Sequence, residues 1–194
     1  MIPVTNWAKG RAARAGSCAL VALGLVLVHT REARAFERQQ NFGVDGGFTL
    51  LQTQNNGSNV GGGFAFHYTY GLSDAINLCA ETQYSILAQQ NNPSSPRDVP
   101  GYVGSATIGA QYVFDVLRWV PYVGALAGPY MMGGGTISGE SFQFGAQVEA
   151  GLDYQITRSF AIGAAYHEHF MLTAMSTYPL YFNVFARAEY IWGW

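Results

Sequence analysis

The side chains that could do chemistry in this 194-residue chain are a few charged and imidazole groups at odd-numbered positions. Charged residues make up only 11% of the sequence, against roughly 25% in an ordinary soluble protein. The candidate network consists of Asp45, His67, Glu81, Glu149, Arg187 and Glu189; the same parity is shared by Asp153, His167, His169, Gln83, Gln111, Gln143 and Gln147. Charges on the inner face of a narrow structure must be paired or hydrogen-bonded. Arg187 suits this role, because a guanidinium has five donors and can bridge two carboxylates.

This network has two functional interpretations. The first, which we favour, is a polar plug that fills the interior of the fold. The second is a narrow path for ions or protons along the same groups. A third use, metal binding, is suggested by His167 and His169, which are spaced as strand ligands of zinc can be. His67 is expected on a non-neighbouring strand, and no carboxylate is expected to complete a site, so the sequence predicts no metal and no cofactor.

Catalytic patterns are weak in this chain. A nucleophilic His–Ser–acid arrangement is one candidate, since Ser176 lies near Glu168 and His169 in sequence. His169, however, is expected to face inward, and the tight His-x-Ser pattern is missing. There is no phosphate loop, dinucleotide fingerprint or cysteine redox motif, and Cys18 and Cys79 lie too far apart in sequence to indicate a metal site. We therefore predict no catalytic residues and no enzymatic activity.

The elements that would position the network are β-strands. From Phe42 onward, large apolar residues alternate with small or polar ones at period two, and no helical periodicity competes with this pattern. The pattern predicts strands near residues 41–54, 60–72, 76–86, 102–114, 119–131, 141–154, 159–172 and 179–194. Short turns alternate with longer loops, which is typical of a barrel that crosses a membrane. The predicted fold is all-β: an eight-stranded antiparallel up-and-down transmembrane β-barrel.

The size of the aromatic side chains indicates which face of this barrel points outward. After residue 35, 24 of 27 aromatic residues occupy even positions, and the exceptions are Trp119, Tyr181 and Phe185. The interior of an eight-stranded barrel has room only for its own side chains, so these rings cannot all lie inside. The even face should therefore contact lipid, and Tyr122 and Tyr130 are expected among its aromatic girdles near the two membrane interfaces.

The N-terminus has the layout of a secretory signal peptide. Lys9, Arg11 and Arg14 precede an apolar run, and Ala33-Arg34-Ala35 fits a small-x-small cleavage site. We expect residues 1–35 to be a cleaved signal peptide and residues 36–194 to be the barrel. The remaining chain has five basic residues, eleven acidic ones and no Lys, so it lacks the clustered cations that nucleic-acid binding needs.

The C-terminus carries a family resemblance. Tyr190, Trp192 and Trp194 alternate along the last strand and end the chain, which resembles the signal by which the barrel-assembly machinery recognises outer-membrane proteins. Residues 151–163 resemble the sixth and seventh strands of small OmpA-like barrel domains, and residues 120–124 are similar to the start of their fifth strand. The resemblance implies a bacterial outer-membrane location; the chain departs from the OmpA pattern in that we expect no periplasmic peptidoglycan-binding domain.

The same resemblance sets expectations about partners and role. It implies contact with outer-membrane lipids and lipopolysaccharide, and with the barrel-assembly machinery and periplasmic chaperones during biogenesis. We expect a monomer. The predicted function is structural or surface-interacting, with a side-chain-plugged polar lumen; the alternative is a narrow pore or small-solute conduit, and a lipid-modifying enzyme is less favoured.

Overall fold

The computed structural model describes residues 38–53, 57–88, 99–114 and 116–193 of the chain. Their regular elements are eight strands: β1 Gln40–Thr53, β2 Gly57–Gly71, β3 Ile76–Leu87, β4 Tyr102–Val113, β5 Trp119–Gly133, β6 Ser141–Thr157, β7 Phe160–Phe170 and β8 Leu180–Trp192. Every strand begins and ends within three residues of its predicted bounds. Among the described residues, no helix is long and apolar enough to cross a membrane.

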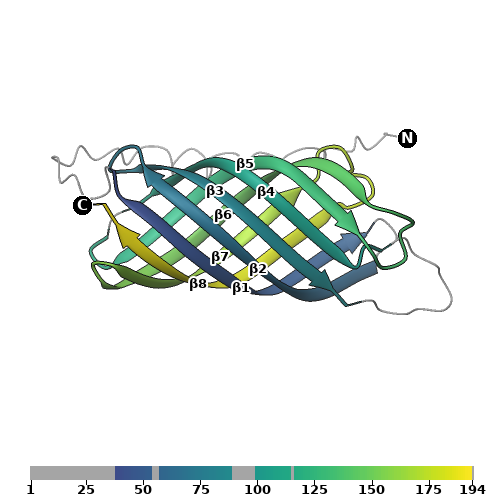
Figure 1. The fold of residues 1–194 in the computed structure, drawn as a ribbon, viewed down its shortest axis with the longest axis horizontal. Coiled ribbons are helices and arrows are strands. Elements are labelled where there is room, and N and C mark those ends of the chain that lie inside the picture. The colour runs from purple at the N-terminus through teal and green to yellow at the C-terminus, as the bar shows by residue number, and fades with distance from the viewer. Residues whose placement is uncertain (1–37, 54–56, 89–98, 115, 194) are drawn as a thin grey trace, which may run out of the picture. The chain divides into compact units, whose positions relative to one another are not determined.

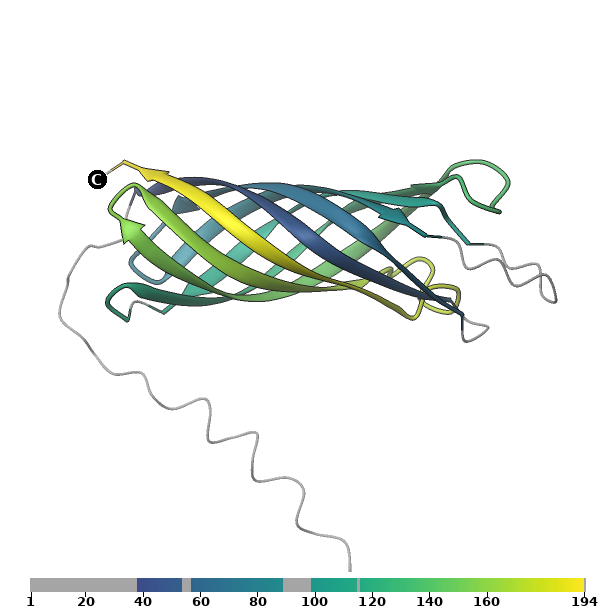
Figure 2. The same cartoon turned by 90° about the horizontal axis from the view of Figure 1, so that it is seen from below.

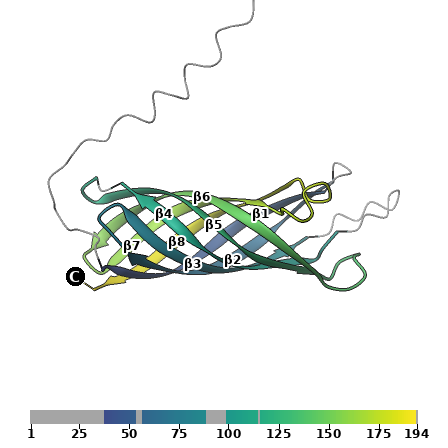
Figure 3. The same ribbon diagram turned by 90° about the horizontal axis from the view of Figure 1, so that it is seen from above.

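The strands form a closed barrel. Each strand pairs antiparallel with the next, and β8 pairs with β1, so the predicted fold class is confirmed. Following the paired residues from Gln40 through all eight strands returns to β1 at Leu50, ten residues further along. A stagger of this kind requires the strands to tilt by roughly 35–45° from the barrel axis. The tilt is visible from three sides in Figures 1, 2 and 3.

The two ends of the barrel differ. One end, called here the turn end, holds the start of β1, the end of β8 and the connections β2–β3, β4–β5 and β6–β7 (Figure 1). The other, the loop end, holds the remaining connections, including residues 134–140 and 171–179. At the turn end, Ser73 Oγ accepts a hydrogen bond from the backbone N–H of Ile76 at 3.2 Å, which closes the short β2–β3 turn.

Alternation along each strand separates an apolar exterior from a mixed interior. In β3, residues at odd positions are buried and those at even positions are more exposed. Large apolar side chains such as Phe64 and Phe66 on β2 are 49% and 42% exposed, and in a membrane this face would contact lipid rather than water. The interior therefore belongs to the odd positions in seven of the eight strands.

Strand β5 is the exception, and it corrects the predicted girdles. Tyr122 and Tyr130 are 4% and 0% exposed and lie inside the barrel, whereas Trp119 is 51% exposed and faces outward. The cause is the register: Tyr112 on β4 pairs with Val123 on β5, so odd and even positions exchange faces there. The β5–β6 register exchanges them back. Whether odd or even positions face the interior is set strand by strand, because one residue more or less in a connection exchanges the two faces of the next strand.

Candidate functional site

Glycines on the inner face make room for long side chains in the lumen. Gly43 lies between Glu189 and His67 in the register of β8, β1 and β2, and a Cβ at Gly43 would overlap the His67 ring. Gly151 lies under Tyr122 in the same way. Because a glycine faces each of these side chains, they can lie across the barrel axis instead of being crowded toward its ends.

The turn-end cluster consists of Asp45, His67, Tyr122, Asp153, Arg187 and Glu189, all buried. Arg187 is the one arginine of this cluster. Its Nη2 lies 2.7 Å from Glu189 Oε1, and its Nε lies 3.4 Å from Asp45 Oδ1 and 3.8 Å from Asp153 Oδ1. Its guanidinium also stacks over the Tyr122 ring at 4.7 Å. One guanidinium thus lies within ion-pair distance of three carboxylates and over one aromatic ring, and these four groups come from four strands. A planar guanidinium with five N–H donors can make contacts in several directions.

His67 connects the carboxylates of this cluster. Its Nδ1 lies 2.8 Å from Asp45 Oδ2, and its Nε2 lies 2.6 Å from Arg187 Nη2 and 2.8 Å from Glu189 Oε1. Nδ1 donates to Asp45, and Nε2 either accepts from Arg187 Nη2 or, when the ring is protonated, donates to Glu189; Arg187 Nη2 also donates to Glu189. The residues of the cluster therefore hold one another in position.

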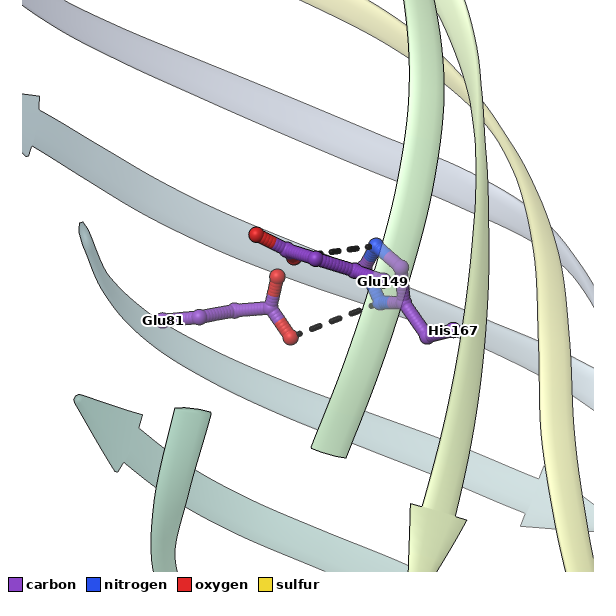
Figure 4. Close-up of side chains that lie close together, drawn as sticks. All are labelled: Glu81, Glu149 and His167. Atoms are coloured by element: carbon purple, nitrogen blue, oxygen red, sulfur yellow. Dashed lines mark ion pairs between the residues drawn. The ribbon is translucent and has the colours of Figure 1, made fainter. Parts of the chain in front are cut away.

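The mid-lumen cluster consists of Glu81, Gln111, Gln147, Glu149 and His167, and its centre is drawn in Figure 4. Gln111 Nε2 donates to Glu149 Oε1 at 2.6 Å, and Gln147 Nε2 donates to Glu81 Oε1 at 3.0 Å. His167 places Nδ1 3.5 Å from Glu81 Oε1 and Nε2 3.7 Å from Glu149 Oε2. The expectation that no carboxylate lies near this histidine is therefore wrong, because Glu149 is its register partner on β6 and Glu81 reaches it across the lumen.

A third layer lies toward the loop end and contains mostly neutral hydrogen-bonding groups. His169 contacts Tyr130 Oη through Nδ1 at 3.0 Å and Asn183 Nδ2 through Nε2 at 2.7 Å. Gln83 Nε2 donates to Tyr181 Oη at 2.7 Å, and Tyr181 Oη donates to Ser85 Oγ at 3.1 Å. This layer links four strands (β3, β5, β7 and β8) with side chains that are all buried.

Above this layer, apolar side chains fill the loop end. The cluster consists of Leu51, Leu87, Val103, Tyr130, Met132, Met171, Tyr178 and Tyr181, with Ile137 and Ala174 packed against it. Tyr178 and Met171 come from the β7–β8 connection, so a loop folds over the barrel opening. The polar layers are therefore bounded by apolar packing on this side.

At the turn end, a small cavity enters the lumen. It is lined by Gln39, Asn41, Thr69, Asn77, Gln111, Val113, Val120, Tyr122, Asp153, Gln155, Ala161, Arg187, Glu189 and Ile191, and it measures about 20 Å³. That volume is about what one water molecule needs. The cavity extends as far as Arg187 and Gln111, which belong to the two clusters described above.

The six predicted network residues therefore fall into two groups. Asp45, His67, Arg187 and Glu189 meet in the turn-end cluster, while Glu81 and Glu149 belong to the mid-lumen cluster. Sequence reasoning missed Tyr122 and Tyr130 as lumen residues, because their even positions were assigned to the outer face. The signal that could have found them is Trp119, a large aromatic residue at an odd position of β5, together with glycines at the even positions Gly124 and Gly128.

The remaining predicted positions are the C-terminal aromatic residues, the signal peptide and the residues weighed for catalysis. Tyr190 and Trp192 face outward on β8 and stack on each other, with ring centroids 5.7 Å apart. Trp194 and the predicted signal peptide, residues 1–35, lie outside the described residues. Ser176 is exposed in a loop, and both ring nitrogens of His169 are already engaged, so the described contacts do not join these residues to Glu168.

Solved structures of small barrels resemble this one. Neisserial surface protein A (NspA) superposes with a TM-score of 0.60 at 15% identity, covering 80% of this chain and 97% of that chain. The N-terminal β-barrel domain of Pseudomonas aeruginosa OprF gives 0.54 at 16% identity, with 80% and 98% covered. Ail, the attachment invasion locus protein of Yersinia pestis, gives 0.53 at 13% identity, with 80% and 99% covered. At these identities the likeness concerns the fold.

Sequence comparison identifies the family. No curated protein sequence matches the chain. Residues 18–185, most of the chain, match the family of outer membrane protein beta-barrel domains, in agreement with the closed eight-stranded barrel and its apolar exterior. The chain therefore belongs to the outer membrane protein beta-barrel domain family.

Proposed function

We propose that this protein is a non-conducting barrel of the bacterial outer membrane, with a structural or surface-interaction role and a lumen filled by its own side chains. The observation that carries the proposal is the stacking of three hydrogen-bonded layers and an apolar cluster along the whole barrel axis. The cavity at the turn end has a volume of about 20 Å³, which is about the space of one water molecule and too small to hold a solute.

The proposed role in surface interaction rests on the outer face and the connections of the barrel, because a filled lumen leaves no path through it. A plugged barrel can act only through its exterior and its connections. The exterior offers large apolar side chains such as Phe48 and Ile108, exposed by 44% and 59%, which suit lipids and the acyl chains of lipopolysaccharide. The loop end also exposes Phe142, Leu172 and Met175. A barrel of the same fold, Ail, is named for attachment and invasion, which supports a role at the cell surface.

We propose that the barrel is monomeric and reaches the membrane through the barrel-assembly machinery and periplasmic chaperones. Closure of the sheet supports the first point, since β1 and β8 satisfy each other and leave no free strand edge. The alternating aromatic residues Tyr190 and Trp192 at the end of β8 support the second.

A narrow conduit is the second candidate. It is favoured by ionisable groups that follow one another in the lumen. Glu189 contacts His67, His67 is the register partner of Glu81, and His167 lies near Glu81 and Glu149; these groups could pass protons or small ions if the network rearranged. Conduction through this series would require the Arg187 contacts to break, and each buried charge left unpaired costs several kcal/mol.

Planar-bilayer conductance of refolded protein tests the proposal. We expect no discrete current steps from the unmodified protein. The combined variant Tyr130→Ala, Tyr181→Ala and Arg187→Ala removes the loop-end rings and the turn-end cation, and it should conduct, which shows that the assay detects an opened lumen. Tyr166→Ala, on the outer face, is the matched control and should behave like the unmodified protein. Regular steps from the unmodified protein would favour the conduit.

A further inference from the structure

The mid-lumen cluster holds two buried carboxylates, Glu81 and Glu149, and no arginine among its residues. In the turn-end cluster, Arg187 forms ion pairs with Asp45, Asp153 and Glu189. No ion pair of the described residues joins Arg187 to Glu81 or Glu149. These two carboxylates are 6% and 1% exposed, and uncompensated charge at such a position is costly.

His167 faces this pair of carboxylates without a hydrogen bond of its own. It is fully buried, and neither ring nitrogen has a hydrogen-bond partner among the described residues. Both nitrogens point toward carboxylate oxygens, at 3.5 and 3.7 Å (Figure 4). Its neighbour His169, two residues along β7, has both nitrogens engaged. A buried imidazole whose nitrogens face carboxylates but accept and donate no hydrogen bond could bind a metal ion together with those carboxylates.

We propose that Glu81, Glu149 and His167 form a binding site for one divalent transition-metal ion of the zinc class. One ligand atom from each residue lies within 4.8 Å of the other two. Two ligands on a tetrahedral zinc ion are about 3.4 Å apart, given metal–ligand distances near 2.1 Å. One ion takes a single ring nitrogen of His167, so the glutamate that faces the other nitrogen would have to rotate toward the ion. One imidazole and two carboxylates suit Zn²⁺, whereas Ca²⁺ and Mg²⁺ prefer oxygen ligands alone.

The surroundings support this assignment. Gln111 and Gln147 donate to the two carboxylates, and such outer hydrogen bonds orient metal ligands in known sites. Phe185 packs edge-on against the His167 ring, with centroids 5.5 Å apart, and fixes its plane. A bound cation would neutralise the two carboxylates and join β3, β6 and β7 at mid-height, so its role would be structural.

The experiment is refolding of the full chain in detergent with Zn²⁺, Mg²⁺ or EDTA, followed by removal of free metal and measurement of metal per chain. We expect one Zn²⁺ and no Mg²⁺ per chain, and a higher urea midpoint for the zinc-refolded barrel. Co²⁺ in place of Zn²⁺ should give the visible absorption of a tetrahedral site.

Three variants test the ligands. His167→Gln and Glu149→Gln should each weaken zinc binding roughly tenfold or more, while His169→Gln, the matched control on the same strand and face, should retain it. Heat-modifiable mobility on gels verifies that each variant folds; if His167→Gln does not fold, Glu149→Gln decides. The proposal is overturned if the unmodified protein binds no zinc, or if His169→Gln loses zinc as strongly as the ligand variants.

Discussion

Replacing Gly43 by alanine tests whether the turn-end cluster holds its side chains in fixed positions. The new methyl group would overlap Cε1 and Nε2 of His67 and would lie 3.1 Å from the backbone oxygen of Ala188. His67 cannot move away without losing its contacts to Asp45 and Glu189. On the opposite face of β1, a methyl group at Gly46 would meet only Gly63 O at 3.8 Å, so Gly46→Ala is the matched control.

The expected magnitude follows from three effects. Inserting a methyl group into a packed interior costs about 1–3 kcal/mol, and leaving a buried polar partner unsatisfied costs about 1–3 kcal/mol. Against these, alanine restricts the unfolded chain and returns about 0.4–1 kcal/mol. We therefore expect Gly43→Ala to lower the free energy of unfolding by about 1–5 kcal/mol, and Gly46→Ala to raise it by up to about 1 kcal/mol.

Equilibrium urea unfolding of the refolded barrel, followed by tryptophan fluorescence, measures both changes. A double-mutant cycle isolates the cause: in a His67→Ala background the imidazole is gone, and Gly43→Ala should then cost less than about 0.5 kcal/mol. The reasoning is refuted if Gly43→Ala and Gly46→Ala shift the midpoint equally, or if the cost of Gly43→Ala persists without His67.

Two further predictions concern charge and closure. Arg187→Met keeps the volume of the side chain but removes the cation from Asp45 and Glu189, so it should lower the free energy of unfolding by roughly 3–5 kcal/mol. The control Arg158→Met, at an exposed turn position, should change the free energy of unfolding by less than about 0.5 kcal/mol. An unchanged urea midpoint for Arg187→Met would show that Arg187 is not part of a paired network. Deleting residues 190–194 removes the pairing of Tyr190 with β1 and β7 and leaves backbone groups unsatisfied in lipid, so the truncated chain should be degraded before assembly; normal amounts in outer-membrane fractions would contradict this.

The fold could be predicted from the sequence because lipid imposes a strict rule on every strand. Apolar residues must alternate with interior ones, and backbone groups must pair within a closed sheet. The run from Val60 to Leu72 follows this rule without interruption, and it forms β2 as expected. Strand number, order and pairing direction then follow from the alternation and the connection lengths.

The reversal of faces in β5 could not be predicted in this way. It depends on how Tyr112 pairs with Val123 across the β4–β5 connection, and a change of one residue in register reverses the outcome. Aromatic parity, counted over the whole chain, therefore placed Tyr122 and Tyr130 on the wrong face.

The contacts across the lumen also lay beyond sequence reasoning. Parity assigns Glu81, Glu149 and His167 to the inner face, but it does not fix their heights. The tilt and the ten-residue stagger bring Glu81 on β3 opposite His167 on β7, although the residues are far apart in sequence. The same geometry assigns Arg187 to Asp45 and Glu189 and leaves Glu81 and Glu149 without it.

The filled lumen is tested most directly at Cys79, whose side chain faces inward on β3 between Thr69 and Gly109 and is fully buried. With Cys18→Ser, it is the only thiol of the chain. A small water-soluble thiol reagent reports whether solvent reaches this inward-facing position, whose register partner Thr69 lines the turn-end cavity. Ser138→Cys in a Cys79→Ala background, at an exposed loop position, gives the rate for an open site. We predict that Cys79 in the folded barrel stays unlabelled and accepts one label per chain in urea; labelling of the folded barrel at the rate of the Ser138→Cys variant would contradict a lumen filled by side chains.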